Sequence, residues 1–193
     1  MLSPELTALL AQADRIQRLV WWALSLAILV YAGAGFAAAG AVAGGAGASG
    51  AGETLRPVLY AAAVANGILS LVLYRRARAP ERLRAHLTAP IAPEVLAQDP
   101  RVGGSPANPI LDRIRRLSDS ERRVLALVPR TFMPWVLCMV LNEAVAIFGL
   151  VLALLAGNRL DVLPFAAAAL ALNAAMFPNN AKLAERALGF TGV

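Results

Sequence analysis

The sequence is poor in the side chains from which most catalytic and metal sites are built. It has one histidine, His86, and one cysteine, Cys138. A single cysteine cannot form a disulfide within the chain, and it excludes metal sites built on pairs of cysteines. No glycine loop that would cradle a phosphate and no Ser/His/Asp grouping is visible in the sequence. These absences argue against an enzyme, and we expect no cofactor and no bound metal.

Charge is also scarce. Charged residues make up 16% of the chain, whereas an average soluble domain has about 25%. Hydrophobic residues make up 59%, and the mean hydropathy is +0.62. This composition excludes an intrinsically disordered chain, a collagen-like repeat and a secreted disulfide scaffold.

In place of charge, the sequence has four long apolar runs. A helix that crosses a bilayer needs about 20 mostly apolar residues. The runs are residues 19–42, 57–74, 131–156 and 162–177, and the last is short and rich in alanine. They predict an all-α, polytopic membrane protein with four transmembrane helices. The first run is longer than the apolar part of a signal peptide, so we expect it to remain in the protein.

The basic residues are distributed unevenly around these runs. Twelve arginines lie between the second and third runs, and four more basic residues lie outside the first and last runs. The other two connections hold only Arg56 and Arg159. This bias predicts that both termini and the middle loop face the cytoplasm of a bacterial inner membrane. We attribute the net charge of +6 to this topology and to anionic lipid headgroups, and we expect no nucleic-acid binding.

The ends of the apolar runs divide the sequence into five parts. At the start, an N-cap at Ser3 and leucines at helical spacing predict an amphipathic helix on the inner membrane surface. The middle loop contains a proline-rich passage that is too broken for a core of its own. We expect its short helices, one of which begins at a capping box from Ser118 to Glu121, to rest on the membrane or on a partner. The parts are an N-terminal helix (1–18), a transmembrane hairpin with a Gly/Ala-rich outer loop (19–74), a basic cytoplasmic loop (75–130), a second transmembrane hairpin (131–178) and a cytoplasmic tail (179–193).

Glu143 is the one Asp, Glu, Lys, Arg or His side chain within the first three apolar runs. It lies twelve residues into the third run, which at 1.5 Å per residue is roughly 18 Å deep and near the middle of the bilayer. Carboxyls at this depth usually face the interior of a helix bundle and mark ion or proton pathways, because removal from water disfavours their charged form. A protonated, hydrogen-bonded carboxyl with a purely structural role is the alternative interpretation.

Two asparagines accompany Glu143 as candidates for ion or proton binding. Asn66 lies midway along the second run, and its amide could hydrogen-bond the Glu143 carboxyl. Asn142 points about 100° away from Glu143 around the helix, so both cannot face one partner squarely. Asn173 is a third intramembrane asparagine. The alternative role for the asparagines is hydrogen bonding between helices, at about 0.6 kcal/mol per pair.

The ten residues from Asn142 to Val151 (NEAVAIFGLV) resemble the carboxylate-bearing helix of the proton-ring (c) subunits of rotary ATPases. In that family a glutamate is followed by small residues, an isoleucine, an aromatic residue and Gly-Leu-Val. The resemblance implies that Glu143 is an ion-binding carboxylate. Ring subunits have a very short cytoplasmic loop, so the loop of more than fifty residues here does not predict a rotor ring. The chain as a whole is more similar to uncharacterised bacterial four-span proteins with a Pro-Phe span, as at Pro164 and Phe165, and that similarity implies no activity.

Two functions from different classes follow from these observations. The first is an ion- or proton-linked membrane component, with Glu143 as the protonatable site. The second is a non-transporting membrane subunit or assembly factor that docks a partner through residues 75–130. A lone intramembrane carboxylate needs a counter-charge to take part in transport, so we expect other membrane subunits or further copies of the chain as partners, in addition to the lipid bilayer.

Overall fold

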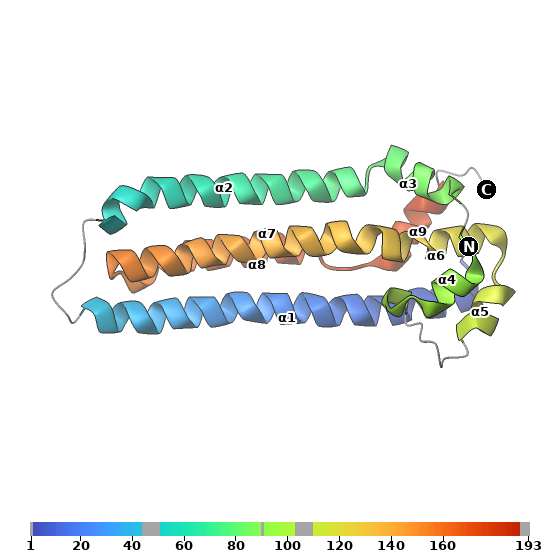
Figure 1. Ribbon diagram of the computed structural model, residues 1–193, viewed down its shortest axis with the longest axis horizontal. Coiled ribbons are helices and arrows are strands. Elements are labelled where there is room, and N and C mark those ends of the chain that lie inside the picture. The colour runs from blue at the N-terminus through green and yellow to red at the C-terminus, as the bar shows by residue number, and fades with distance from the viewer. Residues whose placement is uncertain (1, 44–50, 90, 103–109, 190–193) are drawn as a thin grey trace. The chain divides into compact units, whose positions relative to one another are not determined.

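The computed structural model describes residues 2–43, 51–89, 91–102 and 110–189, and within these ranges every regular element is a helix (Figure 1). The prediction of an all-α chain is therefore confirmed. The helices are α1 (Pro4–Ala43), α2 (Ala51–Ala77), α3 (Pro80–Thr88), α4 (Pro93–Gln98), α5 (Ile110–Arg116), α6 (Asp119–Leu125), α7 (Leu127–Ala156), α8 (Val162–Ala175) and α9 (Asn180–Gly189), with short 3-10 turns η1 (Pro100–Val102) and η2 (Arg159–Asp161). Most of the predicted Gly/Ala-rich outer loop lies outside the described residues.

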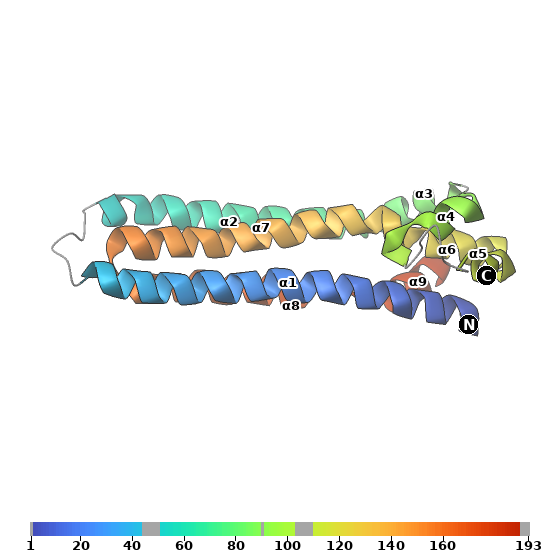
Figure 2. The same ribbon diagram turned by 60° about the horizontal axis from the view of Figure 1, so that its bottom comes forward.

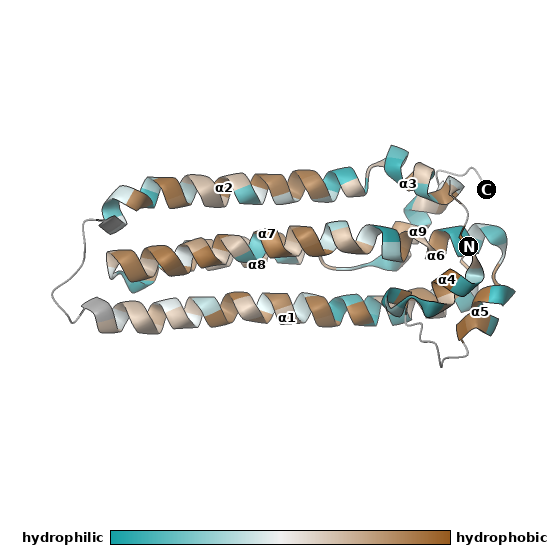
Figure 3. Cartoon of the chain, viewed as in Figure 1, coloured by the Kyte–Doolittle hydropathy of each residue, from teal (hydrophilic) through white to brown (hydrophobic). Residues whose placement is uncertain are grey.

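Three helical stretches are long and apolar enough to cross a membrane. They lie in α1, in α2 and in residues 119–156, which include α7, and their apolar character is visible in Figure 3. The fourth predicted span differs from these three. α8 has 14 residues, or about 21 Å of helix against a hydrocarbon core of about 30 Å. α8 reaches the length and apolar character needed to cross a membrane only when it is taken together with α9, and the two helices are bent by 51° at the break between them.

The chain divides into two compact units. The first, which we call the segmented unit, is made of three stretches that are far apart in the sequence: Met1–Val20, Tyr74–Trp135 and Pro178–Val193. The second, which we call the four-helix unit, consists of Trp21–Leu73 and Val136–Phe177 and contains most of α1, α2, α7 and α8. Each is described by itself below.

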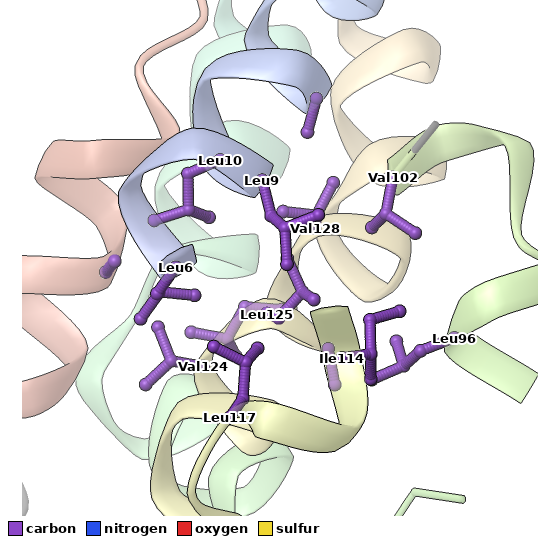
Figure 4. Packing of buried hydrophobic residues seen from close by; sticks show 14 of the residues in the cluster. Leu6, Leu9, Leu10, Leu96, Val102, Ile114, Leu117, Val124, Leu125 and Val128 are labelled. Atoms are coloured by element: carbon purple, nitrogen blue, oxygen red, sulfur yellow. The ribbon is translucent and has the colours of Figure 1, made fainter. Parts of the chain in front are cut away.

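The segmented unit has a hydrophobic core, which the residues of the middle loop share with α1 and α9 instead of forming one of their own. Leucines from α1, α3, α4 and α6 meet in this core with exposures of 0 to 5%. Figure 4 shows Leu6, Leu9 and Leu10 of α1 pointing toward Leu125 and Val124 of α6. Short helices broken by prolines can share a core because α1 and α9 supply its other sides.

The N-terminal residues are also placed differently from the prediction. We expected a separate amphipathic helix on the membrane surface, but α1 is one helix from Pro4 to Ala43. Its leucine face is covered by protein rather than by lipid headgroups. The predicted N-cap is confirmed, since the Leu6 amide donates to the Ser3 hydroxyl over 3.2 Å.

Helix caps and an arginine make hydrogen bonds within the segmented unit. The predicted capping box is present at α6, with Ser118 as its N-cap and Glu121 as the reciprocal acceptor. Asp14 of α1 accepts a hydrogen bond from the Asn180 amide at the first residue of α9, over 2.9 Å. Arg101 donates to the Pro129 carbonyl over 3.1 Å. The bond between Asp14 and Asn180 joins the N-terminal stretch to the C-terminal one, and the other two contacts lie within the middle stretch.

In the four-helix unit, the helices lie side by side along their lengths (Figures 1 and 2). Its core consists mainly of alanine, valine and a few larger residues, among them Ile28, Leu152 and Phe165. A glycine is required at one close approach. A Cβ atom at Gly149 of α7 would lie 2.6 Å from the Cβ of Phe165, so α7 and α8 could not pack here with any larger residue.

α2 and α8 run in the same direction and in constant register. Each of four contacts joins a residue of α2 to a residue 105 or 106 positions later: Arg56 with Asp161, Tyr60 with Phe165, Gly67 with Leu172, and Ser70 with Met176. A constant offset along two helices means that they lie parallel. The start of α2 therefore lies beside the start of α8.

Candidate functional site

Glu143 of α7 is hydrogen-bonded to a tyrosine on α1. The Tyr31 hydroxyl donates to Oε1 of Glu143 over 2.9 Å, and both side chains are half-buried. No other hydrogen bond reaches Glu143 from the described part of the chain. The bond joins α1 to α7 within stretches that are apolar enough to cross a membrane.

The structure does not bring Asn66 to Glu143. Asn66 is half-buried on α2 and makes no hydrogen bond to any residue that the structure describes. The reason is the order of helices around α7. Successive residues of a helix are about 100° apart, and the face that carries Glu143 turns toward α1 rather than toward α2.

Asn142 has a different set of partners, as its angle from Glu143 predicted. Its Nδ2 donates to Oδ1 of Asn173 on α8 over 3.0 Å, and Nδ2 of Asn173 donates to the Ser25 hydroxyl on α1 over 3.3 Å. Both asparagines are completely buried. The Trp21 indole N–H donates to the Asn173 backbone carbonyl over 2.8 Å. This chain of hydrogen bonds connects α1, α7 and α8.

A buried serine brings α2 into the same network. The Ser70 hydroxyl donates to the Cys138 carbonyl of α7 over 3.1 Å and lies 3.8 Å from Sδ of Met176. The Asn142 amide lies 3.6 Å from the same sulfur atom. Ser70 and Met176 are completely buried. All four helices of the unit thus meet around a small set of neutral polar groups.

Sequence reasoning missed Tyr31, Ser25 and Ser70 as members of these contacts. Each lies within a predicted span, where a hydroxyl costs several kcal/mol unless it is hydrogen-bonded. That cost was a usable signal, because it requires a partner for every intramembrane hydroxyl. The sequence does not say which helix supplies the partner.

One polar atom in this network has no partner. Oδ1 of Asn142 is buried and accepts no hydrogen bond from any described residue. A buried acceptor without a donor costs about 1–3 kcal/mol.

An ionic cluster lies where α2 and α8 begin. Nη2 of Arg56 donates to Oδ2 of Asp161 over 2.8 Å and lies 3.4 Å from Oε1 of Glu53. Asp161 is 8% exposed, whereas the Glu53 side chain is 76% exposed. Nearby in the chain, the Arg159 guanidinium lies 5.0 Å from the centre of the Phe36 ring of α1, in a cation–π contact.

Metal ligands do not gather in the part of the chain that the structure describes. No three His, Cys, Asp or Glu side chains come together there to hold an ion. Cys138 is buried.

In the segmented unit, the surroundings of His86 change its pKa. Burial lowers the pKa of His86, and the positive charges of Arg130 and Arg82 lower it further. Arg130 also donates hydrogen bonds to the His86 and Ala89 carbonyls. Burial and the nearby arginines thus disfavour the protonated form of the His86 imidazole.

Comparison of the chain with protein-family models, with curated proteins and with solved structures gives no match. The resemblances to rotary-ring carboxylate helices and to four-span bacterial proteins therefore stay predictions.

Proposed function

We propose that the chain is an integral protein of a bacterial inner membrane with four membrane-crossing segments and both termini in the cytoplasm. Support comes from the distribution of charge between the two units. The segmented unit holds 16 of the 18 Lys and Arg residues, and the four-helix unit holds only Arg56 and Arg159. Positive charge is retained on the cytoplasmic side of such membranes. In this topology α8 forms the fourth segment, and α9, which belongs to the segmented unit, lies on the cytoplasmic side.

Within this protein, the function that the geometry supports best is that of an ion- or proton-linked membrane component. The observation that carries it is the 2.9 Å bond between Tyr31 and Glu143. A carboxyl inside hydrocarbon is costly, and such residues are usually retained where an ion or proton moves. The tyrosine fixes one carboxyl oxygen and leaves the other to exchange a proton or contact a cation. Asn66 and Asn142 stay predictions as ion-binding residues, and other membrane subunits or further copies of the chain would supply the counter-charge.

The test is carbodiimide labelling of the protein in native membranes across a pH series, because the reagent modifies protonated carboxyls in apolar surroundings. We expect labelling at Glu143 that decreases as pH rises and that is absent in Glu143→Gln. Tyr31→Phe removes the hydrogen bond and should change the pH profile. Tyr60→Phe is the matched control, because Tyr60 is an exposed tyrosine of the same unit for which the structure shows no hydrogen bond.

Two results would oppose this function. Absence of labelling at every pH would identify a sealed, structural carboxyl. Labelling followed by normal ion flux and normal growth of the Glu143→Gln variant would show a reachable carboxyl with no role in transport.

A second function, as a non-transporting subunit or assembly factor, is favoured by one observation. The segmented unit is a folded module with its own core, and such a module can present a fixed surface to a partner. Arg116 and Arg123 are exposed and make no ion pair with a described residue. This function predicts that Arg116→Glu with Arg123→Glu abolishes a specific cross-linked complex in native membranes, whereas Glu143→Gln and the control Arg159→Glu preserve it.

A further inference from the structure

A groove runs between α2 and α8 on the surface of the four-helix unit. It has a volume of about 580 Å³ and a lining that is almost entirely apolar. Both helices contribute small lining residues, among them Ala63 and Gly67 of α2 and Ala168 and Ala171 of α8, beside larger apolar ones such as Ile68 and Leu172. The volume falls within the range of pockets that hold small organic ligands, about 300–1,000 Å³.

The groove exists because α2 packs through small side chains. The buried residues that the structure describes on α2 are Gly52, Ala63 and Ser70. The larger residues of this helix, such as Val64 and Ile68, remain 58 to 59% exposed. A groove therefore remains between the two parallel helices, beside the contacts of Tyr60 with Phe165 and of Gly67 with Leu172.

The length of the groove matches one leaflet of a bilayer. Its lining on α2 extends from Tyr60 to Leu71, which at 1.5 Å per residue is about 16 Å. The hydrocarbon core of a bilayer is about 30 Å thick, so one leaflet is about 15 Å. A lipid tail fills one leaflet, whereas a helix from a second copy would need a groove along the whole span.

Charged groups lie at one end of the groove. Arg56 and Asp161 each precede a lining residue, Tyr60 and Phe165, by about one helical turn. The Arg56 side chain is 35% exposed, and Glu53 lies beside it. The exposed part of this end thus offers one guanidinium and one carboxylate. A zwitterionic headgroup complements both, with its phosphate toward Arg56 and its ammonium toward Glu53.

We propose that the α2–α8 groove binds one acyl chain of a zwitterionic aminophospholipid, whose headgroup lies at Arg56 and Glu53. The ionic cluster sets the depth of the lipid, and the small residues admit its tail. This inference rests on the proposed membrane topology but not on Glu143, which does not line the groove, so it stands or falls separately from the ion- or proton-linked function.

The experiment uses the full chain in nanodiscs that contain phosphatidylethanolamine with a photoreactive diazirine in its acyl chain. Ala171→Leu narrows the groove, and Ala174→Leu is the matched control, because both alanines are exposed on α8 but only Ala171 lines the groove. We expect cross-links to groove residues in the wild type and in Ala174→Leu. In Ala171→Leu they should fall about tenfold, which corresponds to roughly 1.4 kcal/mol.

A second arm tests the headgroup. Replacing phosphatidylethanolamine by phosphatidylglycerol removes the ammonium, and Glu53→Gln removes its partner, so either change should reduce cross-linking several-fold. Both leave the groove itself intact. Equal cross-linking with the two lipids would overturn the assignment of the headgroup.

Two outcomes would overturn the assignment of the tail. Equal cross-linking in wild type, Ala171→Leu and Ala174→Leu would show ordinary lipid contact with no bound chain. An oligomer that Ala171→Leu dissociates and Ala174→Leu preserves would show that a second copy occupies the groove. Circular dichroism of the three proteins controls for folding, which an exposed alanine should not affect.

Discussion

The two units of this protein bury their side chains in opposite ways. The segmented unit places large leucines at its centre and arginines on its surface. The four-helix unit has alanines and neutral polar groups at its centre, and large residues such as Leu26, Leu29 and Ile68 on its surface. The first pattern suits water, where burial of apolar area drives folding. The second suits hydrocarbon, where helices associate through close packing of small residues and through hydrogen bonds.

The comparison explains why one chain uses leucine for two purposes. In α1, Leu9 is completely buried and Leu29 is 53% exposed, although both lie in the same uninterrupted helix. Leu9 contributes to a core, and Leu29 contributes to an apolar surface. Stability should therefore respond to the position of a leucine along α1 rather than to its residue type.

The largest predicted effect tests this difference directly. Leu9→Ala should destabilise the segmented unit by about 2–5 kcal/mol, because it creates a cavity in a closed core. Leu29→Ala should change stability by no more than about 0.5 kcal/mol, as for most exposed positions. The measurement is limited proteolysis and denaturant unfolding of each variant in a membrane mimetic. Equal losses in the two variants would mean that the two units do not differ in their packing.

A pair of glycines provides the next test. At Gly149, an added methyl group would overlap Phe165, so Gly149→Ala should cost about 1–3 kcal/mol as an overpacked core position. At Gly33 of α1 no atom lies within 4 Å of the added carbon, so Gly33→Ala should stabilise the helix by up to about 1 kcal/mol. The measurement is the thermal unfolding temperature of each variant compared with that of the wild type. A stabilised Gly149→Ala variant would show that α7 and α8 are not in close contact.

The third prediction concerns the polar network. Asn173→Ala removes two side-chain hydrogen bonds and leaves the Asn142 amide without its acceptor, so we expect a loss of about 1–2 kcal/mol. Asn66→Ala is the matched control, because Asn66 makes no hydrogen bond with a described residue. It should be nearly neutral. The free energy of unfolding of both variants is measured in bicelles. A larger loss of stability in Asn66→Ala than in Asn173→Ala would show that the hydrogen bonds of Asn173 do not stabilise the unit.

The features that could be predicted from the sequence are local ones. The Ser118 capping box, the N-cap at Ser3 and the long apolar helices are each determined by residues a few positions apart. The spacing of Leu6, Leu9 and Leu10 likewise indicated an apolar face. What covers that face was not predictable, because its neighbours Leu83, Leu125 and Leu183 lie at distances of about 70 to 180 residues in the chain.

The candidate site shows the same limit. Glu143 was identifiable because a carboxyl in an apolar run is unusual by composition alone. The hydrogen-bond partner of Glu143 was not identifiable from the sequence, because Asn66 and Tyr31 lie at comparable positions in their helices. Only the packing of the helices selects between them. The structure selects Tyr31.

The smallest predicted effect is acid destabilisation of the segmented unit. Hydrogen bonds from Ser3 and Ser118 hold the pKa of the Glu121 carboxyl below its ordinary value of 4.5, although burial acts in the opposite direction. In Asp99 burial also raises the pKa, but hydrogen bonds from Arg101 outweigh it and the pKa lies below 3.8. A carboxyl with a lowered pKa in the folded state contributes stability above its unfolded pKa. That stability is lost as pH falls below 4.5 and through the lowered value.

Glu121→Gln should therefore be less stable than the wild type at pH 7 and should lose less stability on acidification. Glu185→Gln is the control, because Glu185 is an exposed carboxyl of the same unit that the structure shows in no hydrogen bond or ion pair. Protease resistance of the segmented unit, measured from pH 7 to pH 3, compares the three proteins. If Glu121→Gln and the wild type lose resistance in parallel, the contact between the start of α1 and the start of α6 does not stabilise this unit, and its stability rests on the leucine core alone.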